Sequence, residues 1–481
     1  MKEWVSVIGL EVHLQLKTKT KIWCGCSTEY DKSLPNTHTC PICLGYPGAL
    51  PKLNKKVLEY AIKAALALNC KINYTSGFDR KNYYYPDTPK NYQITQFEKP
   101  YCENGYLDFK LSSGKEIRTR ITRIQIEEDA AKNIHSSNET LINFNRSSIP
   151  LLEIISDPDL RSSEEAYEYL NTLKSIIKYT KISDVSMELG SLRCDANISV
   201  MEKGATVFGQ RIEVKNLNSF KGVAKAINYE INRQIEILET GGEIFQETRL
   251  WDDNMQVTKL MRSKAEAMDY GYFSEPDLQK LVISEKMIED IKKDMPESKK
   301  DKLERFLKEY QIPEYDIAQL CTDMELADYY EAVVKKSKNP KLSSNWIMSE
   351  VMRVLKEQSK NIEEFSITAN DLGEIIILID KGIISNKIAK EVFEIKLTDL
   401  RSPEEIVSTN NMGQITDLAI IEKMVDKVIE SNVKMVEDYQ NADEGKKPRV
   451  LKGLMGQVIK ESKGKANPEI VARLFEEKFK V

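Results

Sequence analysis

Hydrophobic and polar residues alternate along residues 8–16, near the start of the chain. Every second residue from Ile8 to Leu16 is apolar, which is the period of a β-strand that lies with one face on a core. The opposite face carries Gly9, Glu11, His13 and Gln15. A carboxylate beside a neutral imidazole on one strand face indicates half of a divalent-metal site. The alternative is a half-exposed strand whose polar face is only hydrated.

Helical periodicity follows at residues 53–69, about 162–179 and about 221–239. Asn54 is predicted to cap the first of these helices, because its side chain can accept a hydrogen bond from a free backbone N–H. Strand-like alternation returns at residues 187–199 and places Arg193, Asp195 and Asn197 on one face. The first part of the chain therefore mixes strands and helices.

The second part of the chain has a different pattern. Residues 286–410 are rich in Lys and Glu with helical periodicity, which predicts a helical domain with solvated charged faces. A last helical unit begins near residue 412. Residues 446–465 contain seven basic residues and one acidic residue, which indicates a contact with a phosphate backbone. The seven are Lys446, Lys447, Arg449, Lys452, Lys460, Lys463 and Lys465. The alternative is a basic tail without function.

Composition limits the class of protein. With 481 residues, 41% of them hydrophobic and 30% charged, the chain is typical of a globular protein with several domains. No apolar run reaches the roughly 18 residues that span a bilayer, and the first residues lack a signal-peptide core. We therefore expect a cytoplasmic protein without a membrane partner. The net charge is −5, so a nucleic acid would need a local basic patch.

Four of the eight cysteines are closely spaced. Cys24 and Cys26 form a C-x-C pair, and Cys40 and Cys43 form a C-x-x-C pair after a short polar loop. Two such pairs match a tetrahedral, all-cysteine zinc site, which is structural because it leaves no open position. His38 is expected to be a bystander. The alternative is four reduced thiols without a metal.

Charged residues gather in three further segments. Arg80, Lys81 and Lys90 lie among tyrosines, a pattern suited to holding phosphates and stacking a base, although an ordinary surface loop has the same spacing. Residues 127–129 are three consecutive acids at the end of a strand-like run, and they repel one another unless a cation or a basic partner holds them. The alternative is a solvated strand end. Glu153 lies inside an apolar run, where a buried carboxylate must be neutral, paired or metal-bound.

These segments, in this order, resemble the B subunits of the tRNA-dependent amidotransferases over essentially the whole chain. The resemblance rests on long motifs that include Gly9–His13, Tyr85–Ile94, Glu127–Ala130, Pro150–Glu153, Gly190–Ser199, Glu213–Ser219, Val436–Tyr439 and Gly464–Pro468. The resemblance implies an α+β fold. A cradle domain with a mostly antiparallel sheet would span residues 1–292 and contain the zinc loop at 24–43. An all-α helical domain would span residues 293–410, and a small all-α tail domain that binds tRNA would span residues 411–481.

The resemblance also implies an activity. The family converts Glu-tRNA(Gln) to Gln-tRNA(Gln), or Asp-tRNA(Asn) to Asn-tRNA(Asn), and uses ATP and Mg²⁺ to phosphorylate the side-chain carboxylate. The residues at the family's magnesium positions are Glu11, His13, Glu128 and Glu153. Arg80, Lys81, Lys90 and Arg193 are expected to neutralise the phosphates. The implied partners are the amidase (the A subunit of the heterotrimer), which supplies ammonia, a small C subunit and the mischarged tRNA.

The chain departs from the usual pattern of the family at several positions, which are Gln125, Ala131, Ser148, Gly271, Ser274 and, in the tail, Arg449 and Val450. The expected metal ligands are all present. The choice between Glu-tRNA(Gln), Asp-tRNA(Asn) and both stays open at this point. A competing hypothesis is a zinc-containing tRNA-binding or scaffold protein without catalysis, because the zinc motif and the basic tail suit both functions.

Overall fold

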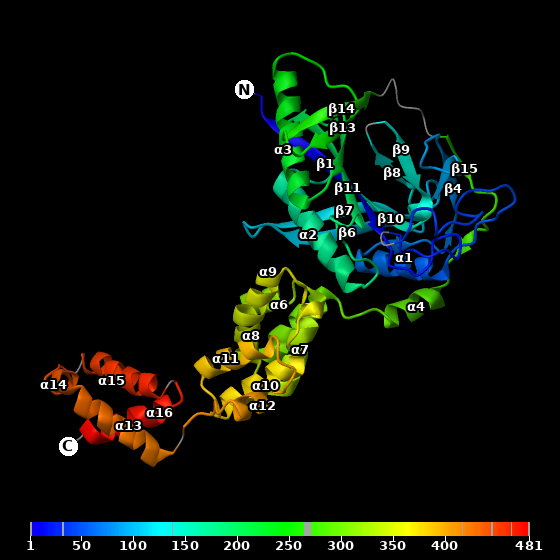
Figure 1. The fold of residues 1–481 in the computed structure, drawn as a ribbon. Coiled ribbons are helices and arrows are strands. Elements are labelled where there is room, and N and C mark those ends of the chain that lie inside the picture. Colours follow the sequence, from blue (N-terminus) through cyan, green and yellow to red (C-terminus); the bar gives the residue numbers. More distant parts are fainter. Residues whose placement is uncertain are drawn as a thin grey trace. The chain divides into compact units, whose positions relative to one another are not determined.

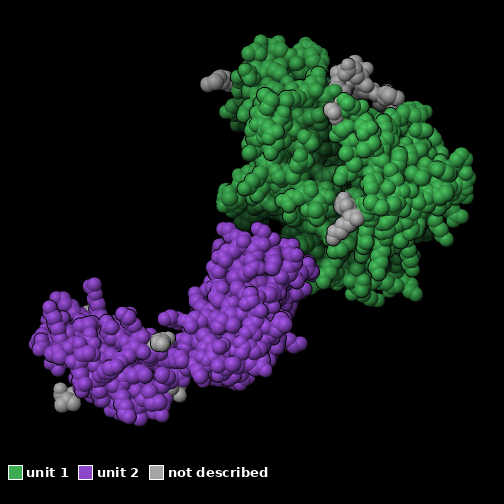
Figure 2. Space-filling model, viewed as in Figure 1, with its two compact units in different colours: residues 1–299 green, residues 300–481 purple. Residues whose placement is uncertain are grey.

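The structure is a computed structural model of the chain. It describes residues 2–30, 33–136, 138–263, 271–415, 417–443, 446–462 and 464–479. Lys463 of the predicted basic stretch lies outside these residues. The chain divides into two compact units, residues 1–299 and residues 300–481 (Figures 1 and 2). Within the described ranges, no helix combines the length and the apolarity that crossing a bilayer requires.

A nine-stranded sheet forms the frame of the first unit, with strand order β14-β13-β12-β11-β1-β10-β7-β6-β2 (Figure 1). The strands are β1 (Trp4–Gln15), β2 (Lys71–Ile72), β6 (Cys102–Lys110), β7 (Glu116–Glu128), β10 (Pro150–Ser156), β11 (Leu192–Glu202), β12 (Ile212–Leu217), β13 (Glu247–Asp252) and β14 (Val257–Ser263). Neighbouring strands are antiparallel except for β12 and β13, which run parallel. The predicted α+β fold with a mostly antiparallel sheet is therefore confirmed.

The strand predicted from the opening alternation is the central strand β1. Ile8, Leu10, Val12 and Leu14 are at most 1% exposed and belong to the core of the first unit. Because side chains alternate across a strand, Glu11 and His13 lie on the opposite face. Since β1 pairs with β10 on one side and β11 on the other, polar residues of three strands meet on that face.

Helices pack on the apolar face of the sheet, where they complete the core. They are α1 (Lys55–Ala67), α2 (Ser163–Tyr179) and α3 (Phe220–Glu239), and α4 (Glu285–Lys293) packs on α1. All three predicted helices are thus present. The predicted cap is confirmed as well, because the Asn54 side chain accepts a hydrogen bond of 2.9 Å from the backbone N–H of Lys56.

Short strands form three smaller sheets in the first unit, with orders β15-β4-β5, β16-β3 and β8-β9. Their bounds are β3 (Thr75–Ser76), β4 (Asp79–Asn82), β5 (Tyr92–Thr95), β8 (Lys132–His135), β9 (Thr140–Asn143), β15 (Gly271–Ser274) and β16 (Leu281–Val282). The 3₁₀ turn η1 (Phe144–Arg146) follows β9. The tyrosine-containing segment expected to hold phosphates therefore includes two short strands, β4 and β5.

The second unit is helical, as predicted. Its helices are α5 (Lys299–Tyr310), α6 (Glu314–Leu320), α7 (Met324–Ser337), α8 (Pro340–Trp346), the π-helix η3 (Ile347–Val351), α9 (Met352–Gln358), the 3₁₀ turn η4 (Ile362–Glu364), α10 (Ala369–Asp380), α11 (Asn386–Lys396), α12 (Pro403–Thr409), α13 (Leu418–Ser431), α14 (Val433–Gln440), α15 (Lys447–Glu461) and α16 (Pro468–Phe479). Two separate hydrophobic clusters stabilise it, one between Phe306 and Val407 and one between Ile421 and Phe475.

Candidate active site

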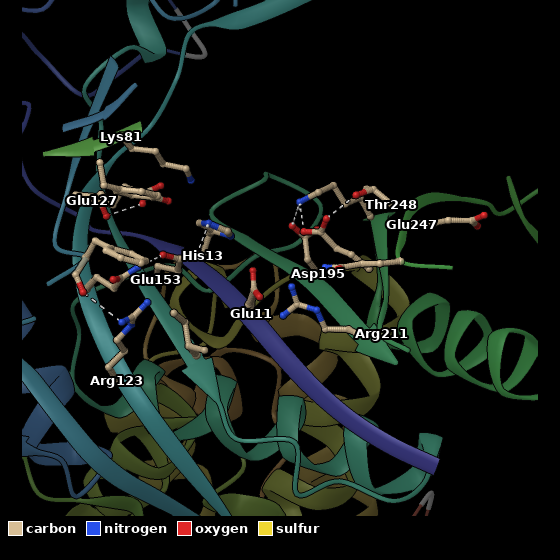
Figure 3. A pocket seen from close by; sticks show the side chains of 18 residues that line it. Glu11, His13, Lys81, Arg123, Glu127, Glu153, Asp195, Arg211, Glu247 and Thr248 are labelled. Carbon is tan, nitrogen blue, oxygen red and sulfur yellow. Dashed lines mark hydrogen bonds and ion pairs between the residues drawn. The ribbon is translucent and has the colours of Figure 1, made fainter. Parts of the chain in front are cut away.

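The polar face of the large sheet lines a cavity of about 550 Å³. Figure 3 shows side chains from β1, β7, β10, β11 and β13 that point into it. Its acidic, basic and amide side chains are Glu11, His13, Lys81, Arg123, Gln125, Glu127, Glu153, Asp195, Arg211, Glu213, Lys215, Gln246 and Glu247. Such a density of charge in one concave surface is typical of a site that binds charged ligands and performs chemistry on them.

Three of the four residues expected to bind magnesium meet in this cavity. Glu153 lies directly opposite His13 in the β1–β10 register, and 3.5 Å separates His13 Nε2 from Glu153 Oε1. Burial lowers the pKa of His13, so its imidazole is neutral near pH 7 and offers a lone pair to a cation. Burial, followed by the charges of Glu153 and Glu213, raises the pKa of Glu11. These repelling carboxylates would be stabilised by a divalent cation between them.

Glu127 completes this group of acids. It is 2% exposed and lines the cavity, and its Oε2 accepts a hydrogen bond of 2.9 Å from Thr95 Oγ1. Burial raises the pKa of its carboxyl to about 7, while the charge of Lys81 acts in the opposite direction. Figure 3 shows Glu127 and Lys81 near each other at one end of the cavity, with Glu153 and His13 next to them.

A second charged group forms the other wall of the cavity. Lys215 Nζ lies 2.6 Å from Asp195 Oδ2 and 2.8 Å from Glu213 Oε1. Thr248 Oγ1 donates a hydrogen bond of 2.9 Å to the other oxygen of Glu213. Although burial opposes the charged form of Lys215, the two carboxylates raise its pKa. With two carboxylates and one ammonium, this group has one negative charge in excess, and it holds fixed hydrogen-bonding groups toward the cavity.

Two arginines of the cavity form no direct ion pair with any acid that the structure describes. Among the residues that the structure describes, no carboxylate oxygen lies within 4.0 Å of the guanidinium nitrogens of Arg123 or Arg211. Arg123 Nη1 donates a hydrogen bond of 3.3 Å to the Phe97 carbonyl oxygen, and its guanidinium carbon lies 5.3 Å from the centre of the Phe97 ring. Both arginines are thus available to bind an anion, which a guanidinium does with paired N–H donors.

The structure does not bring Glu128, the fourth expected magnesium ligand, together with the other three. Glu128 follows Glu127 on β7, so its side chain points to the opposite face. It is 3% exposed and forms a salt bridge with Lys90, whose Nζ lies 2.5 Å from Oε2. Ser148 Oγ and the Ile94 N–H also donate hydrogen bonds to it, at 2.6 and 2.8 Å. Protein groups therefore already satisfy the carboxylate of Glu128.

The four expected phosphate-binding cations have different positions. Of these four, only Lys81 lines the cavity of about 550 Å³. Arg80 is held by Glu275 at 2.8 Å, Lys90 by Glu128, and Arg193 by Asp129 at 2.9 Å. Direct ion pairs thus partly neutralise the charges of Arg80, Lys90 and Arg193, whereas Arg123 and Arg211 form no such pair with a described carboxylate.

The four cysteines of the predicted zinc site lie together. The sulfur atoms of Cys24, Cys26, Cys40 and Cys43 all lie within 4.8 Å of one another. The backbone N–H of Cys40 donates a hydrogen bond of 3.2 Å to Cys43 Sγ. A hydrogen bond from Cys24 is the main reason that the pKa of Cys43 is lowered to about 5, with burial opposing this change. Four thiols in this geometry fit a tetrahedral metal ion, and His38 does not belong to the cluster.

Reasoning from the sequence noted Glu127 in the acidic run 127–129 but assigned no role in the site to Arg123, Glu127, Asp195, Arg211, Glu213 or Lys215. The period of two along β7 is a usable signal for some of them, because Arg123, Gln125 and Glu127 share one face. The alternation of residues 187–199 places Asp195 on one face with Arg193 but assigns it no role. No local pattern shows that β12 and β13 border the same cavity.

Comparisons with known proteins agree with the resemblance. A family model described as the GatB/GatE catalytic domain matches residues 6–289, and one described as the GatB domain matches residues 328–479. The aspartyl/glutamyl-tRNA(Asn/Gln) amidotransferase B subunit of Fusobacterium nucleatum is 68% identical over 480 residues and covers 100% of both chains. B subunits of the same name from Carboxydothermus hydrogenoformans and Clostridium tetani are 52% and 50% identical, over 100% and 99% of this chain and 99% and 98% of their own. The chain therefore belongs to the family of aspartyl/glutamyl-tRNA(Asn/Gln) amidotransferase B subunits.

Proposed function

We propose that this chain activates the side-chain carboxylate of Glu-tRNA(Gln), Asp-tRNA(Asn) or both by phosphorylating it with ATP, so that ammonia can convert it to an amide. The names of the relatives support the tRNA substrates. One observation carries the proposal: a single cavity combines Glu11, His13, Glu127 and Glu153 with two arginines that form no direct ion pair with any described acid. Acids that hold a cation and arginines that hold phosphates are the groups that phosphoryl transfer requires.

The chemistry explains why activation is needed. A carboxylate resists attack by ammonia, because its negative charge repels a nucleophile and it has no good leaving group. When a carboxylate oxygen attacks the γ-phosphorus, ADP departs and an acyl phosphate forms. Ammonia then attacks the acyl carbon, phosphate departs and the amide remains. The protein must therefore position two anions against each other, which costs free energy unless positive groups surround them.

The residues present fit a magnesium ion. Glu11, Glu127 and Glu153 offer hard oxygen ligands, and His13 offers a neutral nitrogen. Bound magnesium would offset the charge between these acids and the phosphate oxygens. The family motif predicts Glu128 as a magnesium ligand. Its side chain, however, lies on the opposite face of β7 and is paired with Lys90, so we favour Glu127 as the ligand.

The remaining side chains of the cavity would bind and orient the reactants. Arg123 and Arg211 would hold the phosphates and the substrate carboxylate, and Lys81 adds a further positive charge beside Glu127. Acids already pair with Arg80, Lys90 and Arg193, so these residues would contribute only positive potential and no direct contact with the phosphates. Asp195, Glu213 and Lys215 would supply fixed hydrogen-bonding groups at the other wall.

We further propose that ammonia comes from the amidase A subunit, that a small C subunit joins the complex in the cytoplasm, and that the tail at residues 411–481 binds the tRNA. The four-cysteine cluster would hold one zinc ion with a structural role. The competing hypothesis of a scaffold without catalysis is not favoured by the family match, and a scaffold has no need for four metal-binding groups inside a charged cavity.

The experiment that tests this function is transfer of the γ-phosphate of ATP to the carboxylate of mischarged tRNA, with the amidase and the small C subunit present. Glu153→Gln keeps the shape of the side chain and removes its charge, so we expect phosphorylation to fall at least about 100-fold. Binding of tRNA should remain near the wild-type level. Wild-type phosphorylation by this variant would contradict the proposed function, and comparing the two mischarged tRNAs would identify the substrate.

A further inference from the structure

Lys21 is a completely buried lysine beside the four-cysteine cluster. Its relative exposure is 0%, and its Nζ lies 3.7 Å from Cys43 Sγ. The same ammonium donates a hydrogen bond of 3.3 Å to the carbonyl oxygen of Phe144. The backbone N–H of Lys21 donates to the carbonyl oxygen of Cys26 at 2.9 Å, so both the main chain and the side chain of Lys21 contact the cysteine loop.

No acid balances the charge of this lysine. In the part of the chain that the structure describes, no carboxylate oxygen lies within 4.0 Å of Lys21 Nζ. The other buried lysines among the described residues differ, because each reaches a carboxylate: Lys63 that of Asp294, Lys302 that of Asp328 and Lys396 that of Asp371. An isolated ammonium in a protein interior is strongly unfavourable unless a negative charge compensates it. The thiols beside Lys21 are the groups that can supply that negative charge.

We propose that Lys21 is the counter-ion of the metal centre formed by Cys24, Cys26, Cys40 and Cys43. Four thiolates around a divalent ion carry a net charge of about −2, because metal-bound thiols lose their protons. The ammonium of Lys21 offsets part of this excess without taking a ligand position. Lys21 is thus a positioning residue for the metal centre, and this inference rests on the metal proposed there.

The same contacts connect the metal centre to the catalytic sheet. Lys21 holds the Phe144 carbonyl, Ser147 Oγ donates to the Cys43 carbonyl at 3.2 Å, and the Ile22 N–H donates to the Ser148 carbonyl at 3.0 Å. Ser148 in turn donates to Glu128, at the end of β7. Residues 144–148 are therefore fixed from one side by the cysteine loop and from the other by the strand that carries Glu127. Loss of the counter-ion should loosen this connection.

The test uses the full-length chain as wild type, Lys21→Met and Lys19→Met, each prepared with zinc and without it. Lys21→Met keeps much of the side chain and removes its charge. Lys19→Met removes the same charge from an exposed position two residues away and is the matched control. Zinc affinity is measured by competition with a coloured chelator, and the melting temperature is measured for the loaded and the metal-free forms.

We expect Lys21→Met to bind zinc roughly 10- to 100-fold more weakly than wild type, the range for loss of an outer-shell partner. The metal-free variant should melt no lower than metal-free wild type, since the unbalanced ammonium is gone. Lys19→Met should match wild type throughout. A structural role alone would lower both melting temperatures equally.

Other outcomes distinguish a failure of the role proposed for Lys21 from a failure of the proposed metal site. Wild type without zinc-binding capacity would refute the metal centre and the inference together. Zinc bound by Lys21→Met with wild-type affinity would overturn only the inference. If Lys21→Met does not fold, Lys21→Arg replaces it because it keeps the charge. Unchanged affinity of Lys21→Arg supports the inference, and a loss as large as that of Cys43→Ser overturns it.

Discussion

At the scale of single residues, two adjacent acids have different environments. Glu127 faces the cavity with a pKa raised to about 7 by burial, whereas Glu128 lies on the other face of β7 in a salt bridge with Lys90. The cause is the pleat of the strand, which sends successive side chains to opposite faces. Two residues of one type, one position apart, are therefore expected to have separate roles.

Ser148 shows how a single departure from the family pattern is accommodated. Its backbone φ is +63°, in the left-handed region that favours glycine, and its hydroxyl donates to Glu128 at 2.6 Å. The backbone conformation costs about 1–2 kcal/mol for a residue with a Cβ atom. A hydrogen bond to a charged group contributes about 1.5–3 kcal/mol. The serine thus compensates for its own strain by holding Glu128.

This balance predicts an order of stability. Ser148→Gly relieves the strain but loses the hydrogen bond, so its melting temperature should fall slightly below that of wild type. Ser148→Ala keeps the strain and loses the bond, so it should melt lowest of the three. Calorimetry of the full-length proteins measures all three. A Ser148→Gly protein that melts above wild type would show that the hydroxyl contributes less than the strain costs.

At the scale of elements, strand and helix periods predicted much of the first unit. Alternation along β1 identified Glu11 and His13 on one face, and the helical periods at α1, α2 and α3 were present in the structure. These signals are local, since a strand or helix with one buried face repeats its apolar residues within a few positions. The Glu153 side chain was also correctly expected to need a partner, because it lies in an apolar run.

Long-range pairing is what the sequence could not show. Arg80 is bound by Glu275, which lies 195 positions away, and Arg193 is bound by Asp129. A loop with arginines and tyrosines has the same pattern whether its charges are paired or free. Arg211 was not selected from the sequence, because no short motif surrounds it. Its place in the site depends on β12 bordering the cavity.

The cysteine loop gives a prediction at this scale. Purified wild type should contain one zinc ion per chain, and Cys40→Ser should lose it, because the cluster then lacks one of its four thiolates. In the metal-free protein, amide hydrogen exchange should rise around residues 144–148, which the loop holds through Ser147. Elemental analysis and exchange mass spectrometry measure the two effects. A zinc content near zero in wild type would rule out this site.

At the scale of the whole molecule, the tail has its own core and a basic face. Residues between Ile421 and Phe475 form a cluster separate from that of the preceding helices. Arg449, Lys452 and Lys460 are exposed on α15, and their spacing places them on one side of the helix. An exposed basic face on a protein of net charge −5 is suited to a phosphate backbone.

Removal of residues 412–481 should therefore weaken tRNA binding and make it less sensitive to salt. Each lost phosphate contact should reduce the slope of log affinity against log salt concentration by roughly 0.7–0.9. Replacing Arg449, Lys452 and Lys460 by alanine should produce part of the same change without altering the core. Filter binding at several salt concentrations measures both. An unchanged affinity and slope for the truncated chain would exclude the tail as a tRNA contact.

The most direct test of the proposed catalytic site compares Glu127→Gln with Glu128→Gln. The measurement is transfer of the γ-phosphate of ATP to Glu-tRNA(Gln) or Asp-tRNA(Asn), with the amidase and the small C subunit present. Because only Glu127 faces the cavity, Glu127→Gln should reduce phosphorylation at least about 100-fold, and Glu128→Gln should reduce it much less. Loss with Glu128→Gln alone would return the magnesium role to Glu128, and wild-type phosphorylation by both variants would contradict a kinase site in this cavity.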